Sequence, residues 1–210
     1  MAKKASSRAP GVTRDPARTQ ERILAAALAE FADGGLAGAR VDRIARRARV
    51  NKRMLYHYFG GKQELFRRLV SHKVTERSRQ KETHGDDPAT SLPLNFLHNC
   101  HDVDWVRLLA WESLQTTKDQ VVNEPDRRQA SLRGQKRLEQ QQAKGRLPAD
   151  LPVACLQLAM VALAMFPVAM PQITRLIMGR TFGDPEFQRE YAGLLKKMAV
   201  ALTPPPAGSP

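Results

Sequence analysis

The sequence has few cysteines and little acidic charge, and no apolar stretch follows its first lysines. Its 210 residues include only 2 cysteines, Cys100 and Cys155, which stand far apart and form no CxxC pair. This spacing encodes neither a disulfide framework nor a zinc ribbon, so we expect a chain that works in the reducing cytoplasm. Because the N-terminal lysines precede polar residues, we also expect no secretory signal peptide.

Sequence motifs of catalysis are missing as well. The chain contains no GxSxG, no phosphate-binding loop, no HExxH and no paired carboxylates in a glycine-rich setting. We therefore expect a protein that is not an enzyme, with an all-helical enzyme as a minor alternative. Four possible metal ligands stand near one another: His98, Cys100, His101 and Asp102. Their irregular spacing favours a helix end with partly buried histidines, so we expect no metal and no cofactor.

One apolar segment, residues 153–170, invites comparison with a membrane span. Its 18 residues are at the lower limit of the length that crosses a bilayer. Gln157 lies in its middle and Pro167 near its end, and Pro152 precedes it as a helix start. These features favour a buried helix or a subunit interface over association with a membrane.

Basic residues are concentrated in the first part of the chain. The 34 Lys and Arg residues exceed the 21 Asp and Glu residues by 13, and the isoelectric point is about 10.3. Residues 1–81 contain 20 basic and 7 acidic residues, whereas residues 82–210 contain 14 of each. A nucleic-acid-binding module fused to a neutral module would have this asymmetry. Solvated helix faces and a basic tail would also have it, so the residue pattern must decide.

Helical spacing of apolar residues dominates the chain, and no strand-like alternation persists. We therefore expect an all-α fold. Residues 1–17 and 203–210, which are polar and rich in proline, are expected to form a disordered basic arm and a disordered tail. Between them a first helix runs from Thr19 to the glycines after Asp33. Further apolar helical segments lie at 41–48, 54–59, 62–80, 89–100, 103–117, 125–143, 151–178 and 185–202.

The residues around Ala45 have the pattern of a helix-turn-helix. Ala45 supplies the small residue where two short helices cross, and the interruption at 49–51 supplies the tight turn. The side-chain oxygen of Asn51 can cap the second helix. This register leaves four side chains facing outward: Lys52, Arg53, Tyr56 and His57. Such side chains can bond guanine edges and phosphates, which favours a helix that reads the major groove of DNA.

Residues 19–31, followed by VDRIARRARVNKRMLYHYFGGKQELF at 41–66, resemble the DNA-binding domain of the TetR family of bacterial regulators. The most specific pieces are Ile44-Ala45, the LYHYF stretch at 55–59, and Lys62 followed by Leu65-Phe66. Two departures from the family pattern affect the turn and the start of its second helix. Arg49 stands where the family usually has glycine, at a cost of about 1 kcal/mol if φ is positive. Ala39-Arg40 replace the hydroxyl residues that usually precede the second helix, and we expect Arg40 to contact a phosphate instead.

The resemblance implies a homodimer whose recognition helices enter successive major grooves of a palindromic operator. The expected helix-turn-helix domain spans residues 18–64, and a helical domain for effector binding and dimerisation spans 65–202. The resemblance assigns base reading to Lys52 and Arg53, and phosphate contacts to Tyr56, His57 and Lys62. Together with Arg40 and the capping Asn51, these form the candidate DNA-binding set. The basic arm could reach a minor groove, but a solvated tail is the favoured interpretation.

The neutral part of the chain contains a candidate effector site. The helix that begins near residue 104 is too apolar for a surface helix, so it should lie centrally. Its Glu112 could anchor a ligand, although an exposed or salt-bridged glutamate is commoner. The candidate ligand residues are Trp105, Leu108, Trp111, Glu112, Met160, Met165 and Phe166. For the last three, packing in a core or dimer interface is the favoured interpretation and cavity lining the alternative.

These assignments predict a repressor that a small, mostly apolar effector releases from DNA. The segments 151–178 and 185–202 should pair with their copies in a four-helix interface, because the first is more apolar than a monomer surface tolerates. An architectural DNA-binding protein without an effector is the alternative.

Overall fold

The computed structural model describes residues 15–115 and 121–203 of the chain. All regular structure within these residues is helical, which confirms the all-α prediction. The helices are α1 (Pro16–Gly38), α2 (Val41–Arg47), α3 (Lys52–Phe59), α4 (Lys62–Thr83), α5 (Pro88–His101), α6 (Val103–Gln115), α7 (Glu124–Ala143), α8 (Val153–Ala169), α9 (Pro171–Met178) and α10 (Pro185–Ala201).

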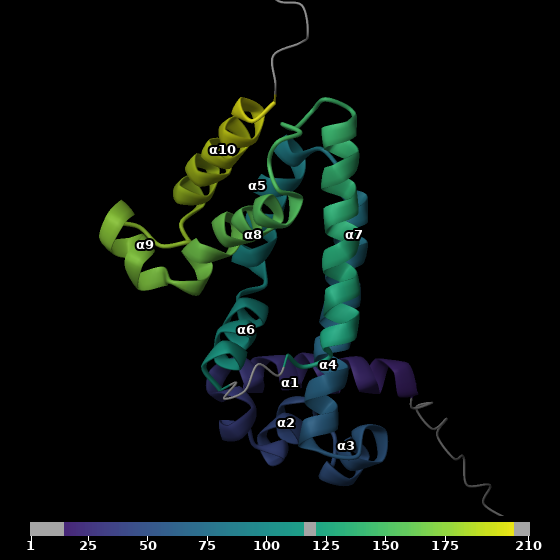
Figure 1. Ribbon diagram of the computed structural model, residues 1–210. Coiled ribbons are helices and arrows are strands. Elements are labelled where there is room, and N and C mark those ends of the chain that lie inside the picture. The colour runs from purple at the N-terminus through teal and green to yellow at the C-terminus, as the bar shows by residue number, and fades with distance from the viewer. Residues whose placement is uncertain (1–14, 116–120, 204–210) are drawn as a thin grey trace, which may run out of the picture.

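The helices form a small unit at one end and a larger unit above it (Figure 1). Helices α2 and α3 lie beneath α1, and α4 leads from this end into the larger unit, where it packs against α7. Helix α5 packs against both α8 and α10, whereas α9 projects to the side. This arrangement puts the predicted helix-turn-helix at the far end of the molecule.

Helix α1 begins at Pro16, so the last residues of the predicted arm, 1–17, are helical. Proline is accommodated because the first helical N–H has no intrahelical partner, and Asp15 caps Ala17 N and Arg18 N at 3.0 and 3.3 Å. Most of the predicted arm and tail, 1–14 and 204–210, lies outside the described residues. Gly35, at φ 64°, kinks the helix near its predicted end, but helical structure resumes through Gly38.

The prediction of one helix over residues 151–178 is wrong. Helices α8 and α9 meet at Met170 with a bend of 85°. Met170 has φ −121° and ψ 63° because the ring of Pro171 excludes the helical conformation from the residue before it. Pro167, by contrast, is tolerated inside α8. Among the described residues, no single helix meets the length and hydropathy of a membrane span, and only this bent pair meets them jointly.

Two hydrophobic cores meet at α6. The first joins α1 to α4 and includes Trp105 and Leu108 of α6, while the second joins α5, α8 and α10 and includes Val106 of α6. The predicted domain boundary between residues 64 and 65 falls inside α4, whose Leu65 and Leu69 belong to the first core. The helix-turn-helix is thus built on helices that continue into the rest of the protein.

Candidate nucleic-acid interface and ligand cavity

The turn between α2 and α3 has the conformation that the sequence predicted. Arg49 adopts φ 53°, in the left-handed region that glycine usually occupies. The guanidinium of Arg22, on α1, donates to the carbonyl oxygens of Ala48 and Arg49, the latter at 3.1 Å. Val50 N donates to Ala45 O at 3.0 Å and closes the turn. Arg22 therefore helps to hold a backbone conformation that arginine itself disfavours, a role that the sequence did not reveal.

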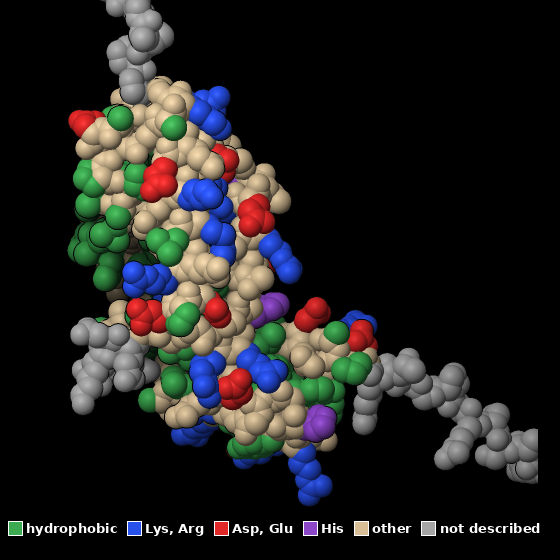
Figure 2. Space-filling view, turned by 45° about the vertical axis from the view of Figure 1, so that its right-hand side comes forward, with side chains coloured by type: hydrophobic (Ala, Val, Ile, Leu, Met, Phe, Trp, Pro, Cys, Tyr) green, Lys and Arg blue, Asp and Glu red, His purple; other side chains and the backbone are tan. Residues whose placement is uncertain are grey.

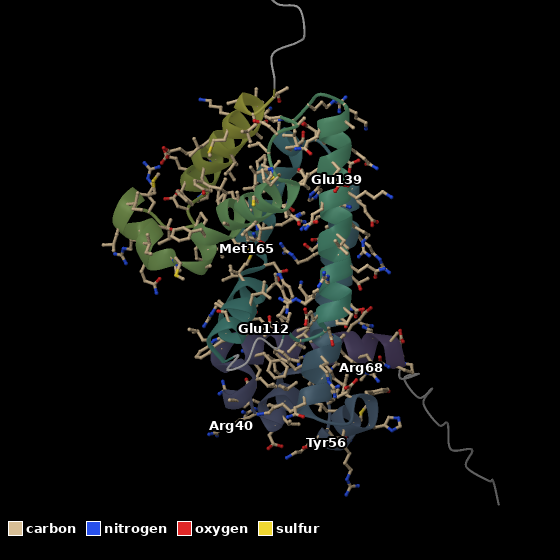
Figure 3. The ribbon with its side chains drawn as sticks, in the orientation of Figure 1. Arg40, Tyr56, Arg68, Glu112, Glu139 and Met165 are labelled. Atoms are coloured by element: carbon tan, nitrogen blue, oxygen red, sulfur yellow. The ribbon has the colours of Figure 1, made fainter. Side chains whose placement is uncertain are left out.

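Helix α3 buries one face and exposes the other. Leu55 and Phe59 are 0% and 2% exposed, whereas the four side chains predicted to face outward are all exposed: Lys52, Arg53, Tyr56 and His57. Asn51 Oδ1 accepts a hydrogen bond from Met54 N at 2.8 Å, which confirms the predicted cap. Tyr56 lies at the far end of the molecule in Figure 3. The exposed face of α3 is thus free to enter a groove of DNA.

Lys52 is held by an acidic neighbour from α2. Its Nζ lies 2.9 Å from Asp42 Oδ1, and both side chains are well exposed. The hydrogen bond and the negative charge of Asp42 raise the pKa of Lys52, so the ammonium stays charged. A base contact by Lys52 requires this exposed pair to open, at modest cost because water screens it.

Two other members of the DNA-binding set also serve the scaffold. The ammonium of Lys62 donates to Ala37 O at 3.2 Å and Ala39 O at 3.1 Å, at the C-terminal end of α1. The backbone N–H of Arg40 donates to Glu30 Oε1 at 3.1 Å, while its side chain is exposed. The phosphate contacts of both residues stay predictions.

Glu30 is a structural residue that the sequence analysis missed. Its side chain is 4% exposed, and besides the Arg40 N–H it binds Arg43 Nε at 3.2 Å. The carboxylate thereby fixes the start of α2 to α1. An acidic residue on the apolar face of α1, directly before Phe31, was the only sequence signal for this contact.

Further exposed cations lie on the helix and turn that precede α3. Arg43, Arg46, Arg47 and Arg49 are exposed on or just after α2. Figure 2 shows lysine and arginine side chains over the lower end of the molecule, where α2 and α3 lie. This distribution matches the basic excess of residues 1–81 and supplies positive charge for a phosphate backbone.

A cavity of about 590 Å³ lies among α4, α5, α6, α7 and α8. Its volume is in the range of small-molecule sites. Three of the predicted ligand residues line it: Trp105, Met160 and Met165. Met165 lies on α8 above α6 in Figure 3. The lining also contains several arginines, so it is more polar than the predicted, mostly apolar effector implies.

The other four predicted ligand residues do not line this cavity. Leu108 is 1% exposed in the first core, and Trp111 Nε1 donates to Ala32 O at 3.1 Å. Phe166 is 46% exposed on the outer face of α8. These side chains were chosen for their chemistry, but each contacts a different neighbour or faces solvent.

Glu112 forms a salt bridge, as the commoner alternative for it predicted. Both of its carboxylate oxygens lie 2.7 Å from Nη1 of Arg127, and Oε1 also accepts from Val122 N at 3.2 Å. Arg127, in turn, lines the cavity. Glu112 therefore ties the start of α7 to α6 and orients a cavity residue rather than lining the cavity itself.

The predicted metal candidates are dispersed among other contacts. Cys100 is buried, which raises the pKa of its thiol to about 12, and Asp102 binds Lys73 Nζ at 2.8 Å. His98 packs against the ring of His84 at a centroid distance of 4.6 Å. Within residues 15–115 and 121–203, no three His, Cys, Asp or Glu side chains are grouped to hold a metal.

Many apolar side chains remain exposed on the last three helices. Figure 2 shows hydrophobic side chains gathered along one edge of the upper part of the molecule. The most exposed of those that do not line the cavity are Leu176 at 85% and Ile177 at 73%. Others on or between these helices are Phe166, Met170, Ile173, Met178, Leu194, Met198 and Val200. We call this set the apolar edge; a stable monomer rarely exposes so many apolar side chains together.

Comparison with known proteins gives matches over most of the chain. The family described as bacterial regulatory proteins, tetR family, matches residues 23–69, and that described as tetracyclin repressor-like, C-terminal domain, matches residues 96–192. The HTH-type transcriptional repressor SCO4008 of Streptomyces coelicolor is 33% identical over 166 residues, which cover 79% of this chain and 86% of that protein.

Solved structures show the same architecture. The crystal structure of SCO4942 from Streptomyces coelicolor has a TM-score of 0.70 at 27% identity, covering 86% of this chain and 97% of that one. A structure from a Rhodococcus species, at 18% identity, has a TM-score of 0.64 and covers 90% and 100% of the two chains. The fold match therefore extends over both the small and the larger unit.

Proposed function

Since this chain belongs to the TetR family of bacterial regulatory proteins and is a DNA-binding transcriptional regulator, we propose that it is a repressor whose dimer binds a palindromic operator and is released when a small molecule fills the cavity. The single observation that carries the DNA-binding part is the exposed face of α3 among the cations of α2. Such a regulator works beside the chromosome, so we expect it in the cytoplasm.

The exposed residues of α3 form two groups, those suited to read bases and those suited to contact phosphates. Arg53 has no ion pair among the described residues, and its guanidinium can form two hydrogen bonds with a guanine edge. Tyr56 and His57 can donate to phosphates, which fixes the register of α3 without reading sequence. Lys52 joins Arg53 as a base reader once it leaves Asp42.

The apolar edge supports the dimer. An operator with two-fold symmetry requires two copies of α3 related by the same symmetry. Leu176 and Ile177 on α9, together with the outer faces of α8 and α10, offer an apolar surface that a second copy can cover. The interface predicted from the segments 151–178 and 185–202 thus becomes a proposal in which α8, α9 and α10 of each copy take part.

Helix α4 supports coupling between the cavity and the DNA. Leu65 and Leu69 of α4 pack in the same core as Leu55 of α3, and Arg77 of α4 lines the cavity. Asn123, at the start of α7, donates through Nδ2 to Arg67 O and Ser71 Oγ at 2.7 Å each. A ligand that draws α4 toward α7 would therefore move the support of α3 and alter the spacing of the two recognition helices.

Selection from random duplex DNA with the full-length protein tests this function. We expect a consensus of two inverted half-sites, and we expect Arg53→Ala to relax base preference at one position in each half-site. Sedimentation of the free protein should show a dimer that Leu176→Asp converts to a monomer, while the control Leu132→Asp, on exposed α7, leaves it a dimer. An unselective or asymmetric consensus would contradict the proposal and favour the architectural alternative.

A further inference from the structure

The cavity lining combines cations with apolar side chains. Arg77 and Lys81 of α4 and Arg137 of α7 are among its cations, and Asp86 is the acidic residue in the lining. Trp105, Met160, Val161, Ala164 and Met165 are among its apolar residues. A site with this mixed lining suits an amphipathic molecule better than a wholly apolar one.

Most cavity cations already have acidic partners. Arg77 binds Asp102 Oδ2 at 3.4 Å and Asn99 Oδ1 at 2.6 Å, and Asn99 is held in turn by Ala164 O at 2.9 Å. Arg137 has only a long contact with Asp86, at 3.8 Å. These contacts fix the guanidinium of Arg77 at the cavity wall.

Two lining cations, Lys81 and Arg133, have no such partner among the described residues, and Lys81 is the less exposed of the two. Within the described part of the chain, no hydrogen bond or ion pair joins its ammonium to another group. Burial, followed by the positive charges of Arg77 and Arg137, lowers the pKa of Lys81. A partly buried cation that faces two like charges and a cavity lacks a counter-charge, which is costly unless a ligand supplies one.

We propose that the effector is a small organic anion whose carboxylate or phosphate binds Lys81 and Arg137, and whose apolar body lies against Trp105, Met160 and Met165. This inference rests on the proposed function, because it assigns the chemistry of the molecule that fills the cavity. Three donors on Lys81 and the fork of Arg137 give an oxyanion charge-assisted hydrogen bonds. The ligand thus supplies the negative charge that the cavity lacks.

Four probes with the same apolar chain test the charge requirement on full-length protein: octanoate, octyl phosphate, octanol and octylamine. We expect octanoate or octyl phosphate to raise the melting temperature and to bind in calorimetry, and the one that binds more tightly identifies the oxyanion. Octanol and octylamine should bind at least about tenfold more weakly. Equal binding of octanol and the anions would overturn the proposal.

Substitutions then test whether Lys81 supplies the positive charge that binds the anion. Lys81→Met should weaken anion binding by about tenfold or more while leaving the ligand-free melting temperature unchanged or higher, because it removes an unpaired, partly buried cation. Lys136→Met is the matched control on exposed α7 and should bind the anions as the unchanged chain does. Anion binding that survives in Lys81→Met would contradict the assignment.

The effect on DNA separates this inference from the function on which it rests. If anions bind through Lys81 but do not release operator DNA, the cavity assignment stands and the release mechanism fails. If neutral apolar compounds release the DNA while no anion binds, the regulator stands and the anionic assignment is overturned.

Discussion

The guanidinium of Arg22 donates to the carbonyl oxygen of Arg49 at 3.1 Å and so connects α1 to the left-handed residue of the recognition turn. Replacing Arg22 with methionine keeps an unbranched apolar stem but removes these bonds. We expect the free energy of unfolding to fall by about 1 kcal/mol. Operator affinity should also fall, because the turn positions α3. Urea denaturation and operator titration measure the two effects, and Arg18→Met, also exposed on α1, should change neither as much.

Glycine at position 49 should remove backbone strain. Arg49 adopts φ 53°, which a side chain disfavours, so Arg49→Gly is expected to raise the free energy of unfolding by up to about 1 kcal/mol. The loss of an exposed cation should at the same time weaken binding to any DNA sequence. A fall in the free energy of unfolding on this substitution would show that the side chain itself stabilises the turn.

Asp42 is expected to restrain DNA binding. It lies 2.9 Å from Lys52, so Asp42→Asn should free the ammonium and remove a negative charge beside the phosphates. We expect tighter binding and a steeper dependence of affinity on salt concentration, measured by titration at several salt concentrations. Asp33→Asn, which pairs instead with Arg107 at 3.7 Å, is the control. Unchanged affinity in Asp42→Asn would mean that Lys52 does not approach the DNA.

Substitutions at Tyr56 and at Lys62 should differ in their effect on stability, although both residues are predicted to contact phosphate. Tyr56→Phe should weaken binding to operator and random DNA alike with little change in stability. Lys62→Met should in addition lower the melting temperature, because its ammonium holds Ala37 O and Ala39 O. Reduced affinity with an unchanged salt slope in Lys62→Met would reject the phosphate contact and leave only the scaffold role.

The paired histidines should make the protein less stable in acid. Burial first, and then Lys81 for His84 and His84 for His98, lowers the pKa of each ring from 6.5. The unfolded chain then binds protons at a higher pH than the folded one, so their contribution to stability is fully present above 6.5 and is lost as the pH falls toward the lowered values. His98→Gln should flatten the decline of melting temperature in this window. His72→Gln, exposed on α4, should leave it unchanged.

The helix-turn-helix was predictable because its signals are local. The cap by Asn51, the tight turn and the burial of Leu55 all depend on residues a few positions apart. The second role of Lys62 was not predictable, since its partners Ala37 and Ala39 belong to a different helix. Local spacing predicted that Lys62 stands near the DNA-binding surface, but only packing brings its ammonium to α1.

The cavity was harder to predict because five helices build it. Trp105 and Met165 were chosen for their chemistry and do line it, but the cations Lys81 and Arg137 come from polar helix faces that looked solvated. The bend at Met170 was not predicted, for a different reason. Apolar residues run through α8 and α9 without a gap in hydropathy, so Pro171 was the sole sequence sign of the bend.

Helix α6 contributes Trp105 and Leu108 to one hydrophobic core and Val106 to the other. Adjacent residues in one turn of α6 thus pack in different cores, and unfolding of either core would remove packing contacts from the other. The two units should melt cooperatively, in one transition. A chimera that joins α1 to α4 of this chain to the remaining helices of a relative should fold poorly unless it also carries a compatible α6. The DNA-binding unit is therefore harder to exchange between relatives than its separate sequence motif suggests.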